Sequence, residues 1–337
     1  MRIGSFTLPD QLLIVAEIGN NHEGDIEVAE TLVRQAADAG ADAVKVQTFQ
    51  TQYFVSAGDK RRYDRLKSFE LSRVEVERLH RLAKSLGLLF LSTPLDLESA
   101  AFLEGLVDAY KIASGDNNFY PLMERICRTG KPIILSSGLS DLERIKASQQ
   151  FIERQWHQEG IQQELVVLHC VSSYPVPPEQ ANVAAIPLLR SELGCPIGYS
   201  DHTVGIEACL AAVALGACLI EKHFTLDTQF SDFRDHQLSA DPNEMTRLVQ
   251  QAKRIRTMLG TPQKVVQPCE IGSSRSSRRS IVAAADLAQG HRLEQKDLTW
   301  IRPAVGLSPG EEDRLLGRCL KRAVFFGEPI QLSDVEG

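Results

Sequence analysis

The sequence of 337 residues lacks a long hydrophobic run and an excess of positive charge. No apolar stretch approaches the roughly 18 residues that a membrane-spanning helix needs. The N-terminal segment 1–10 also lacks the basic stretch and long apolar core of a secretory signal. Lys and Arg total 37 against 44 Asp and Glu, which gives a net charge of −7. A negative chain is repelled by nucleic acid and by anionic membrane surfaces, so we expect it to bind neither.

Disulfide pairing also has little support in the sequence. There are seven cysteines, an odd number, and no two of them form a CxxC pair. This pattern predicts reduced thiols in a cytoplasmic protein. Cys170 directly follows His169 in an apolar segment, so the two side chains should face opposite ways, and we do not expect them to form a nucleophile pair.

The first three quarters of the chain repeat one pattern, in which a short apolar run is followed by a polar turn and a helix-period segment. The candidate strands are 12–19, 43–48, 88–94, 109–114, 132–138, 165–173, 196–203 and 218–226. Eight strand–helix units over about 250 residues predict an α/β fold of the (β/α)8 TIM-barrel type. A doubly wound open sheet is the alternative, and it is less favoured because no glycine-rich phosphate-binding motif follows the first strand.

A second, smaller domain is expected at the C-terminal end. We place the barrel at residues 1–262, a polar linker at 263–278 and a β-rich domain at 279–337. The last region contains an internal repeat, because Gly290, Leu293 and Asp297 recur at the same spacing as Gly327, Ile330 and Asp334. Such a duplication predicts a small pseudo-symmetric β domain.

Polar residues gather at the ends of the predicted strands, where the active site of a parallel barrel lies. Lys45 and Lys111 each interrupt an otherwise apolar strand. A lysine inside a barrel is costly unless a negative charge meets it, so the two predict either a bound anion or buried carboxylates such as Glu17. The hydroxyl groups and glycine-linked amides nearby favour an anionic small molecule, since they are additional hydrogen-bond donors.

Two histidines are expected to lie side by side at the same end of the barrel. His202 and His223 lie at the same depth on the seventh and eighth predicted strands, which are adjacent in the barrel. Two neutral imidazoles beside carboxylates such as Glu17 and Asp235 predict a site for a divalent metal, Mn²⁺ or a similar ion, whose remaining positions are filled by water. The alternative is a pair of hydrogen-bonded core histidines.

Several ordered segments carry a family resemblance that spans nearly the whole chain. They are AEIGNNHEGD, GADAVKVQTFQ, FLSTPLD, YKIASGD, KPIILSSGLS, LHCVSSYPVP, IGYSDHTVG and LGACLIEKHFTLD. Together they resemble the sialic acid synthase family (N-acetylneuraminate synthases and their relatives). The segment SIVAAADLAQGHRLEQKDLTWIRPAVGL resembles that family's antifreeze-like (SAF) domain, which has a β-clip fold.

The resemblance implies a transferase that condenses phosphoenolpyruvate with an N-acyl-mannosamine-type aldose to give a nine-carbon 2-keto acid and phosphate. It implies a divalent metal, with Mn²⁺ expected and Mg²⁺ or Co²⁺ as alternatives. It also implies a domain-swapped homodimer, in which the SAF domain of one subunit covers the barrel of its partner.

The matching motifs also imply roles for individual residues. The implied catalytic residues are Glu17, His202 and His223, and the two histidines are the implied metal ligands. The residues implied to bind phosphoenolpyruvate are Lys45, Thr93, Lys111, Ser114, Ser136 and Ser200. Those implied to face the sugar are Gln47, Tyr174, Asp235 and Arg302, the last reaching across the dimer.

The sequence departs from the family pattern on the sugar side. The segment after QTF is shortened, and SDFRDHQLSADP replaces the common GPDH motif after the eighth strand. Asp116 stands where Glu often occurs, and Ser172 where Asn is frequent. The acceptor therefore stays open between N-acetylmannosamine and legionaminate-type, pseudaminate-type, unacylated (Kdn-type) or 6-phosphorylated sugars. The strands show no additional basic cluster for a second phosphate, which favours a sugar without phosphate.

Other functions remain as alternatives at this point. One is a different metal-dependent barrel transferase or aldolase that acts on another phosphorylated substrate. A second is a sugar- or ice-binding protein that uses the SAF domain, and a third is a structural assembly protein. The buried lysines and the histidine pair count against both non-enzymatic alternatives, because a pure binding protein has no need of them.

Overall fold

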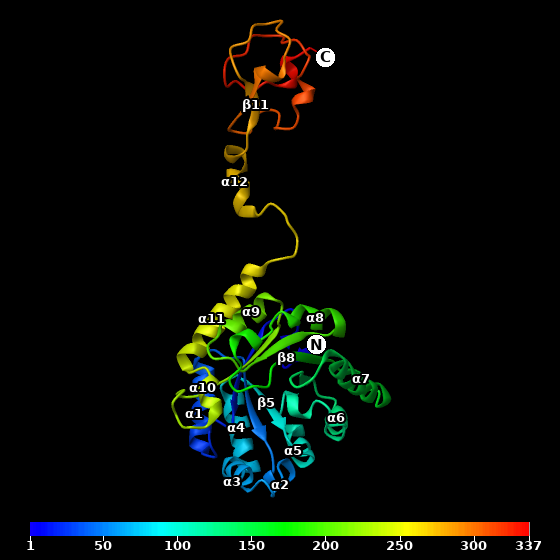
Figure 1. Ribbon diagram of the computed structural model, residues 1–337, viewed down its shortest axis with the longest axis vertical. Coiled ribbons are helices and arrows are strands. Elements are labelled where there is room, and N and C mark those ends of the chain that lie inside the picture. The colour runs from blue at the N-terminus through cyan, green and yellow to red at the C-terminus, as the bar shows by residue number, and fades with distance from the viewer. Residues whose placement is uncertain (337) are drawn as a thin grey trace. The chain divides into compact units, whose positions relative to one another are not determined.

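A computed structural model describes residues 1–336 of the chain (Figure 1). It divides into two units, Met1–Gly260 and Thr261–Gly337. None of the helices in residues 1–336 combines the length and the apolar character that crossing a membrane requires.

The first unit contains a closed barrel of eight parallel strands, as the sequence predicted. In the order in which they pair around the barrel, the strands are β10 (Leu219–His223), β3 (Leu13–Gly19), β4 (Ala43–Thr48), β5 (Leu89–Pro94), β6 (Ala109–Ile112), β7 (Ile133–Ser136), β8 (Leu165–Cys170) and β9 (Ile197–Asp201). The pairing of β10 with β3 closes the ring, which excludes the open doubly wound sheet.

Helices lie around the outside of the strands (Figure 1). The connecting helices are α1 (Ile26–Asp38), α4 (Arg73–Ser85), α5 (Leu97–Phe102), α6 (Tyr120–Cys127), α7 (Leu142–Gln158), α8 (Ala185–Leu193), α9 (Glu207–Ala214) and α11 (Pro242–Leu259). Several begin at an aspartate or serine whose side chain accepts a backbone N–H; at α4, Ser72 and Glu75 form a reciprocal capping box. The apolar sides of these helices bury the outward-facing strand residues, including Val44 and Phe90.

Short additional helices interrupt this pattern where loops cross the C-terminal end of the barrel. They are α2 (Thr51–Phe54) and α3 (Lys60–Phe69) after β4, and α10 (Arg234–Leu238) after β10. Three 3₁₀ turns occur at η1 (Leu103–Gly105), η2 (Ser114–Asp116) and η3 (Pro178–Gln180). Helices α2, α3 and α10 fall in the two segments where the sequence departs from the family pattern.

The barrel interior changes from apolar to polar along its axis. The N-terminal hairpin β1 (Arg2–Ile3) and β2 (Phe6–Thr7) packs Ile3 against inward-facing residues such as Val15 and Leu91, which form an apolar cluster. Because strand side chains alternate, the next inward residues along the same strands are Glu17 and Thr93. The apolar layer therefore closes one end, and the polar layer above it supplies the site.

The second unit is a small β domain with its own apolar core. It contains α12 (Pro268–Ser277), β11 (Ser280–Ala283), β12 (Leu298–Ile301), η4 (Gln295–Asp297), η5 (Glu312–Arg314) and η6 (Leu332–Asp334). Part of the expected linker is thus helical, because Pro268 stands at the first helical position and Gln267 forms a capping box with Glu270.

The internal repeat of the second unit has the same conformation in both copies. Gly290 and Gly327 have φ values of 82° and 78°. The carboxylates of Asp297 and Asp334 each accept a backbone N–H from three residues upstream, both at 2.9 Å. The predicted duplication is therefore confirmed as a repeated turn.

Candidate active site

The C-terminal ends of the barrel strands surround a cavity of about 510 Å³. The predicted site residues that line it are Glu17, Lys45, Gln47, Thr93, Lys111, Ser114, Ser136, Tyr174, Ser200, His202 and His223. Alternation along the strands aims these side chains inward, so residues from all parts of the barrel sequence meet in one place.

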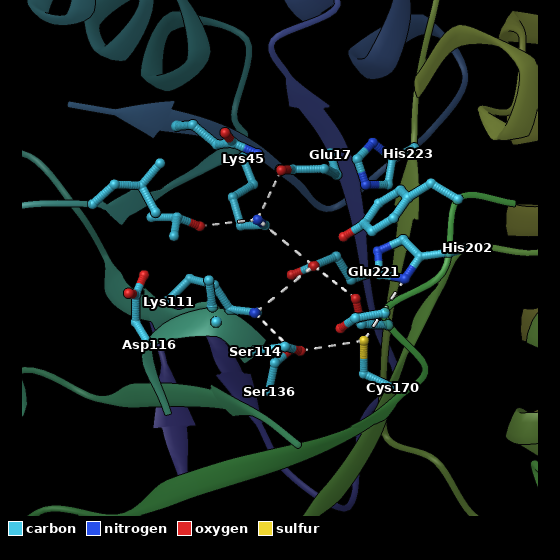
Figure 2. Close-up of a pocket in the computed structure, with 18 of the residues that line it drawn as sticks. Glu17, Lys45, Lys111, Ser114, Asp116, Ser136, Cys170, His202, Glu221 and His223 are labelled. Carbon is cyan, nitrogen blue, oxygen red and sulfur yellow. Dashed lines mark hydrogen bonds and ion pairs between the residues drawn. The ribbon is translucent and has the colours of Figure 1, made fainter. Parts of the chain in front are cut away.

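Four charged side chains form a buried network at the base of this cavity. The Lys45 Nζ lies 2.9 Å from Glu17 Oε1 and 3.6 Å from Glu221 Oε1. The Lys111 Nζ lies 4.0 Å from the same Glu221 oxygen. Figure 2 shows Glu221 between the two lysines, with Glu17 beyond Lys45. The sequence left open whether an anion or carboxylates meet the lysines, and the structure shows that carboxylates do.

The four groups hold their charges to different degrees. Burial raises the pKa of Glu17, and the neighbouring Glu221 carboxylate raises it further. The Lys45 ammonium acts in the opposite direction but does not outweigh them. Burial also opposes ionisation of Glu221, but the Lys111 and Lys45 ammonium groups outweigh it and lower the pKa of that carboxyl. Burial lowers the pKa of Lys111 more than Glu221 raises it. Burial also lowers the pKa of Lys45, but the Glu17 and Glu221 carboxylates outweigh it and raise the pKa overall.

Hydroxyl groups surround the two lysines. Lys45 donates a hydrogen bond to Thr93 Oγ1 at 3.1 Å, and Lys111 donates to Ser136 Oγ at 2.7 Å. Ser200 donates to Glu221 Oε1 at 3.0 Å. Buried carboxylate oxygens without a hydrogen-bond partner among the described residues, Glu17 Oε2 and Glu221 Oε2, lie in the same network. Buried oxygens of this kind need partners, so the site is built to receive additional donors or a cation.

The two histidines face each other, with ring centroids 5.3 Å apart. The Nδ1 atom of His202 lies 2.8 Å from the Val171 carbonyl, which can only accept, so Nδ1 carries the proton and Nε2 has a free lone pair. Burial and the nearby His202 lower the pKa of His223, which keeps it neutral, and its Nδ1 is buried without a partner among residues 1–336.

The histidine pair fits a divalent metal of the Mn²⁺ type. Imidazoles bind such an ion through the lone pair of a deprotonated ring nitrogen, and the other coordination positions would be open to water or substrate. Burial lowers the pKa of His202, but Cys170 and the Val171 carbonyl outweigh it and raise the pKa, so a metal at this ring would compete with a proton. No group of three or more His, Cys, Asp or Glu residues in the described part of the chain has the arrangement of a complete metal site. Only His202 and His223 would therefore hold the ion.

Comparison with known proteins places this site in a family. The family model NeuB matches residues 32–264, and the SAF domain model matches residues 278–336. The chain belongs to the NeuB family. It is 36% identical over 337 residues, covering 96% of this chain and 94% of the relative, to N,N'-diacetyllegionaminic acid synthase of Legionella pneumophila. It is 32% identical to N-acetylneuraminate-9-phosphate synthase of Homo sapiens, covering 85% of this chain and 82% of the relative.

A solved structure has the same architecture as this NeuB-family chain. The N-acetylneuraminic acid synthetase of Leptospira borgpetersenii superposes with a TM-score of 0.76 at 34% identity, covering 81% of this chain and 94% of that one. The fold class and the family predicted from the sequence are therefore confirmed.

Two predicted sugar-side residues lie outside the main cavity of the NeuB-family barrel. Asp235, on α10, lines an adjoining cavity of about 530 Å³. Arg302 follows β12 in the second unit and is exposed. The roles implied for these residues stay predictions, as do those of the residues around the main cavity.

Sequence reasoning missed three residues that line the main cavity. Glu221 received no role from the sequence, although its Oε1 lies 3.6 Å from Lys45 Nζ and 4.0 Å from Lys111 Nζ. Cys170 was considered only as a partner of His169, and its Sγ lies 3.5 Å from Ser114 Oγ and 3.8 Å from His202 Nδ1. Its inward direction follows from the alternation of β8, since His169 faces the other way and contacts the Ala181 carbonyl at 3.0 Å. Arg234 was missed because α10 has no strand or helix pattern in the sequence.

Asp116 supplies a pH-dependent prediction for this site. Burial raises the pKa of its carboxyl from 3.8 to about 6, against Lys111, which lowers it. Between these values the unfolded chain is ionised while the folded protein keeps its proton, so the free energy of unfolding falls as pH rises towards 6. As the pH rises from 5 to 7, the free energy of unfolding of Asp116→Asn should increase by about 1 kcal/mol relative to that of wild type. Urea unfolding at several pH values measures this difference. A difference that stays constant over this range would refute the assignment.

Proposed function

We propose that the chain is a nonulosonic acid synthase, a transferase that condenses phosphoenolpyruvate with an N-acyl-mannosamine-type aldose. The observation that carries the proposal is the meeting of two buried lysines, several hydroxyl groups and a histidine pair in one cavity. Phosphoenolpyruvate is a small anion with a carboxylate and a phosphate, which Lys45 and Lys111 can each approach. The names of the Legionella, human and Leptospira relatives support the same reaction class.

The residues around the cavity divide the work between the two substrates. Lys45 and Lys111, with Thr93 and Ser136 at hydrogen-bond distance, would bind the phosphate and the carboxylate. Binding would draw the ammonium groups away from Glu17 and Glu221, since a multiply charged anion attracts them more strongly.

The acceptor would place its open-chain aldehyde at the histidine pair. A divalent metal bound by His202 and His223 supplies Lewis-acid polarisation of the aldehyde oxygen. Tyr174 lies over His202 with ring centroids 4.2 Å apart, so it would bound the space for the sugar.

The reaction balances with water as the third reactant. Carbon 3 of phosphoenolpyruvate forms a bond to the aldehyde carbon, whose oxygen takes a proton, and positive charge develops at carbon 2. Water adds to carbon 2 and loses a proton, and the carbon–oxygen bond to phosphate then breaks to leave a 2-keto acid and inorganic phosphate. Glu17 and Glu221 lie beside the lysines, where a carboxylate can take the proton from water and stabilise the positive charge.

Inorganic phosphate release tests this proposal. The purified protein would be incubated with phosphoenolpyruvate, with or without Mn²⁺, and with a panel of free and 6-phosphorylated hexoses and N-acyl hexosamines. We expect release that requires the metal and one class of acceptor. Release without any acceptor would indicate a phosphatase instead. No release from folded protein with metal bound would refute the synthase and favour a sugar-binding protein.

A further inference from the structure

Helix α3 is strongly basic although the whole chain is acidic. Its sequence, KRRYDRLKSF, has five basic residues and one acidic residue. Two of the five are paired, since Lys60 lies 2.8 Å from Asp64 and Lys67 lies 2.7 Å from Glu70. The other three, Arg61, Arg62 and Arg65, take part in no ion pair with the described residues.

Two of these unpaired arginines lie on one side of the helix and border a cavity. Arg62 and Arg65 are three positions apart, so they point the same way, and both line the adjoining cavity of about 530 Å³. Arg61 does not line it. The guanidinium of Arg62 lies 5.9 Å from the centre of the Phe54 ring, which also lines the cavity.

A third guanidinium reaches the same cavity from α10. Arg234 lies over the Tyr174 ring, with its carbon 4.5 Å from the ring centre. Its Nε is 3.3 Å from Asp235 Oδ1, so Asp235 offsets part of its charge. Asp232 is the other carboxylate that lines the cavity. Three arginines and two carboxylates line the cavity, which leaves it with a net positive charge. Burial raises the pKa of Asp235, which favours its uncharged form and so increases this positive charge.

The basic cavity continues from the candidate active site. The residues that line both cavities are Gln47, Phe54, Arg62, Tyr174, His223 and Arg234. A sugar whose aldehyde lies at the histidine pair would therefore extend its far end towards Arg62, Arg65 and Arg234. Helix α3 and the segment SDFRDH, which contributes Arg234, both fall where the sequence departs from the family pattern.

We propose that Arg62, Arg65 and Arg234 bind an oxyanion at the far end of the acceptor. The acceptor is then a sugar that carries a phosphomonoester or a carboxylate on the carbon farthest from its aldehyde. This inference rests on the proposed synthase function, and it reverses the expectation of an uncharged acceptor, which considered the barrel strands alone. Guanidinium groups suit the task because they stay charged and bind oxyanions in pairs of hydrogen bonds.

General attraction of anions is the competing explanation for the three arginines. Long-range steering depends on the summed charge of α3, so loss of Arg61 would matter as much as loss of Arg62 or Arg65. Steering would also act on phosphoenolpyruvate. Direct binding of the acceptor depends on the two residues that line the cavity and leaves phosphoenolpyruvate affinity unchanged.

The experiment compares the double variant Arg62→Gln/Arg65→Gln with the matched control Arg61→Gln. The kcat/KM would be measured with neutral mono- and di-N-acylated hexosamines, with N-acetylmannosamine 6-phosphate and with N-acetylmannosaminuronic acid. We expect wild type to prefer one of the two anionic sugars, and which one it prefers identifies the oxyanion. The kcat/KM of the double variant with that sugar should fall by about 10²-fold, on the order of tenfold for each charge-assisted hydrogen bond that is removed. The kcat/KM of the Arg61→Gln control should fall by less than about threefold. The KM for phosphoenolpyruvate should not change in either variant.

Binding without turnover provides an independent measurement. Calorimetric titration with N-acetylmannosamine 6-phosphate and with the uronic acid, in the absence of phosphoenolpyruvate, should show the same loss in the double variant. Efficient phosphate release with a neutral acceptor would overturn the inference and leave the synthase standing. If no acceptor supports phosphate release, the proposed synthase function is wrong. If wild type binds neither anionic sugar, or binds it no more tightly than the double variant does, the inference about the three arginines is wrong too.

Discussion

Replacing Lys111 with methionine is expected to lower kcat/KM for phosphoenolpyruvate by about 10³-fold, the range found when one preorganised donor is removed from a developing or bound anion. Methionine keeps most of the buried volume but removes the charge that lies 2.7 Å from Ser136 Oγ. The protein should stay folded, because Lys45 still faces Glu221 at 3.6 Å. Steady-state phosphate release and thermal unfolding would measure the two effects.

Lys222 provides the contrasting variant for this experiment. It is a neighbour of Glu221 on β10, but it faces away from the cavity and pairs with Asp201 at 2.7 Å, and both side chains are fully buried. Lys222→Met leaves the Asp201 carboxylate without its cation and should cost about 3–5 kcal/mol of stability. If Lys111→Met lost stability to the same degree and kept its kcat/KM, the lysine would be a structural ion-pair partner, and its role in substrate binding would be refuted.

His223→Ala is expected to abolish metal-dependent activity and to weaken Mn²⁺ binding by at least about 10²-fold, since loss of a ligand should exceed the 10–100-fold effect of losing a residue that only supports one. His202 alone would remain as a protein ligand. Paramagnetic resonance titration of free Mn²⁺ measures the affinity directly and does not depend on turnover.

His157→Ala is the control, because His157 lies near the end of α7 and is exposed. It should bind Mn²⁺ as wild type does. Equal Mn²⁺ affinity in wild type and His223→Ala would place the metal elsewhere. The pair would then be interpreted as hydrogen-bonded core histidines, the alternative that the sequence left open.

The barrel could be predicted from the sequence because its signals are local and repeated. Each strand is a short apolar run before a helix-period segment, and eight such units leave few alternatives. The lysine positions were equally informative, since Lys45 and Lys111 interrupt apolar strands and the structure places both in one cavity. The paired histidines follow from the adjacency of β9 and β10.

Features that depend on side-chain direction or on irregular loops could not be predicted as well. Glu221 gains its importance only when β10 closes the barrel beside β3 and brings it to Lys45, which lies far away in the sequence. Arg62 and Arg65 belong to a helix in the long connection after β4, and nothing in their spacing tells which cavity they border. Cys170 received no role because the sequence relates it only to its neighbour His169, and its contact with His202 depends on the pairing of β8 with β9.

Isotope transfer from labelled phosphoenolpyruvate tests the central claim most directly. The oxygen that bridges carbon 2 and phosphorus would be replaced with ¹⁸O, and the phosphate released in the presence of Mn²⁺ and an acceptor would be analysed by phosphorus resonance. Condensation with carbon–oxygen cleavage predicts that the released phosphate carries the label and that a 2-keto acid larger than pyruvate accumulates. Unlabelled phosphate would show phosphorus–oxygen cleavage, and the proposed function of this site would then be wrong.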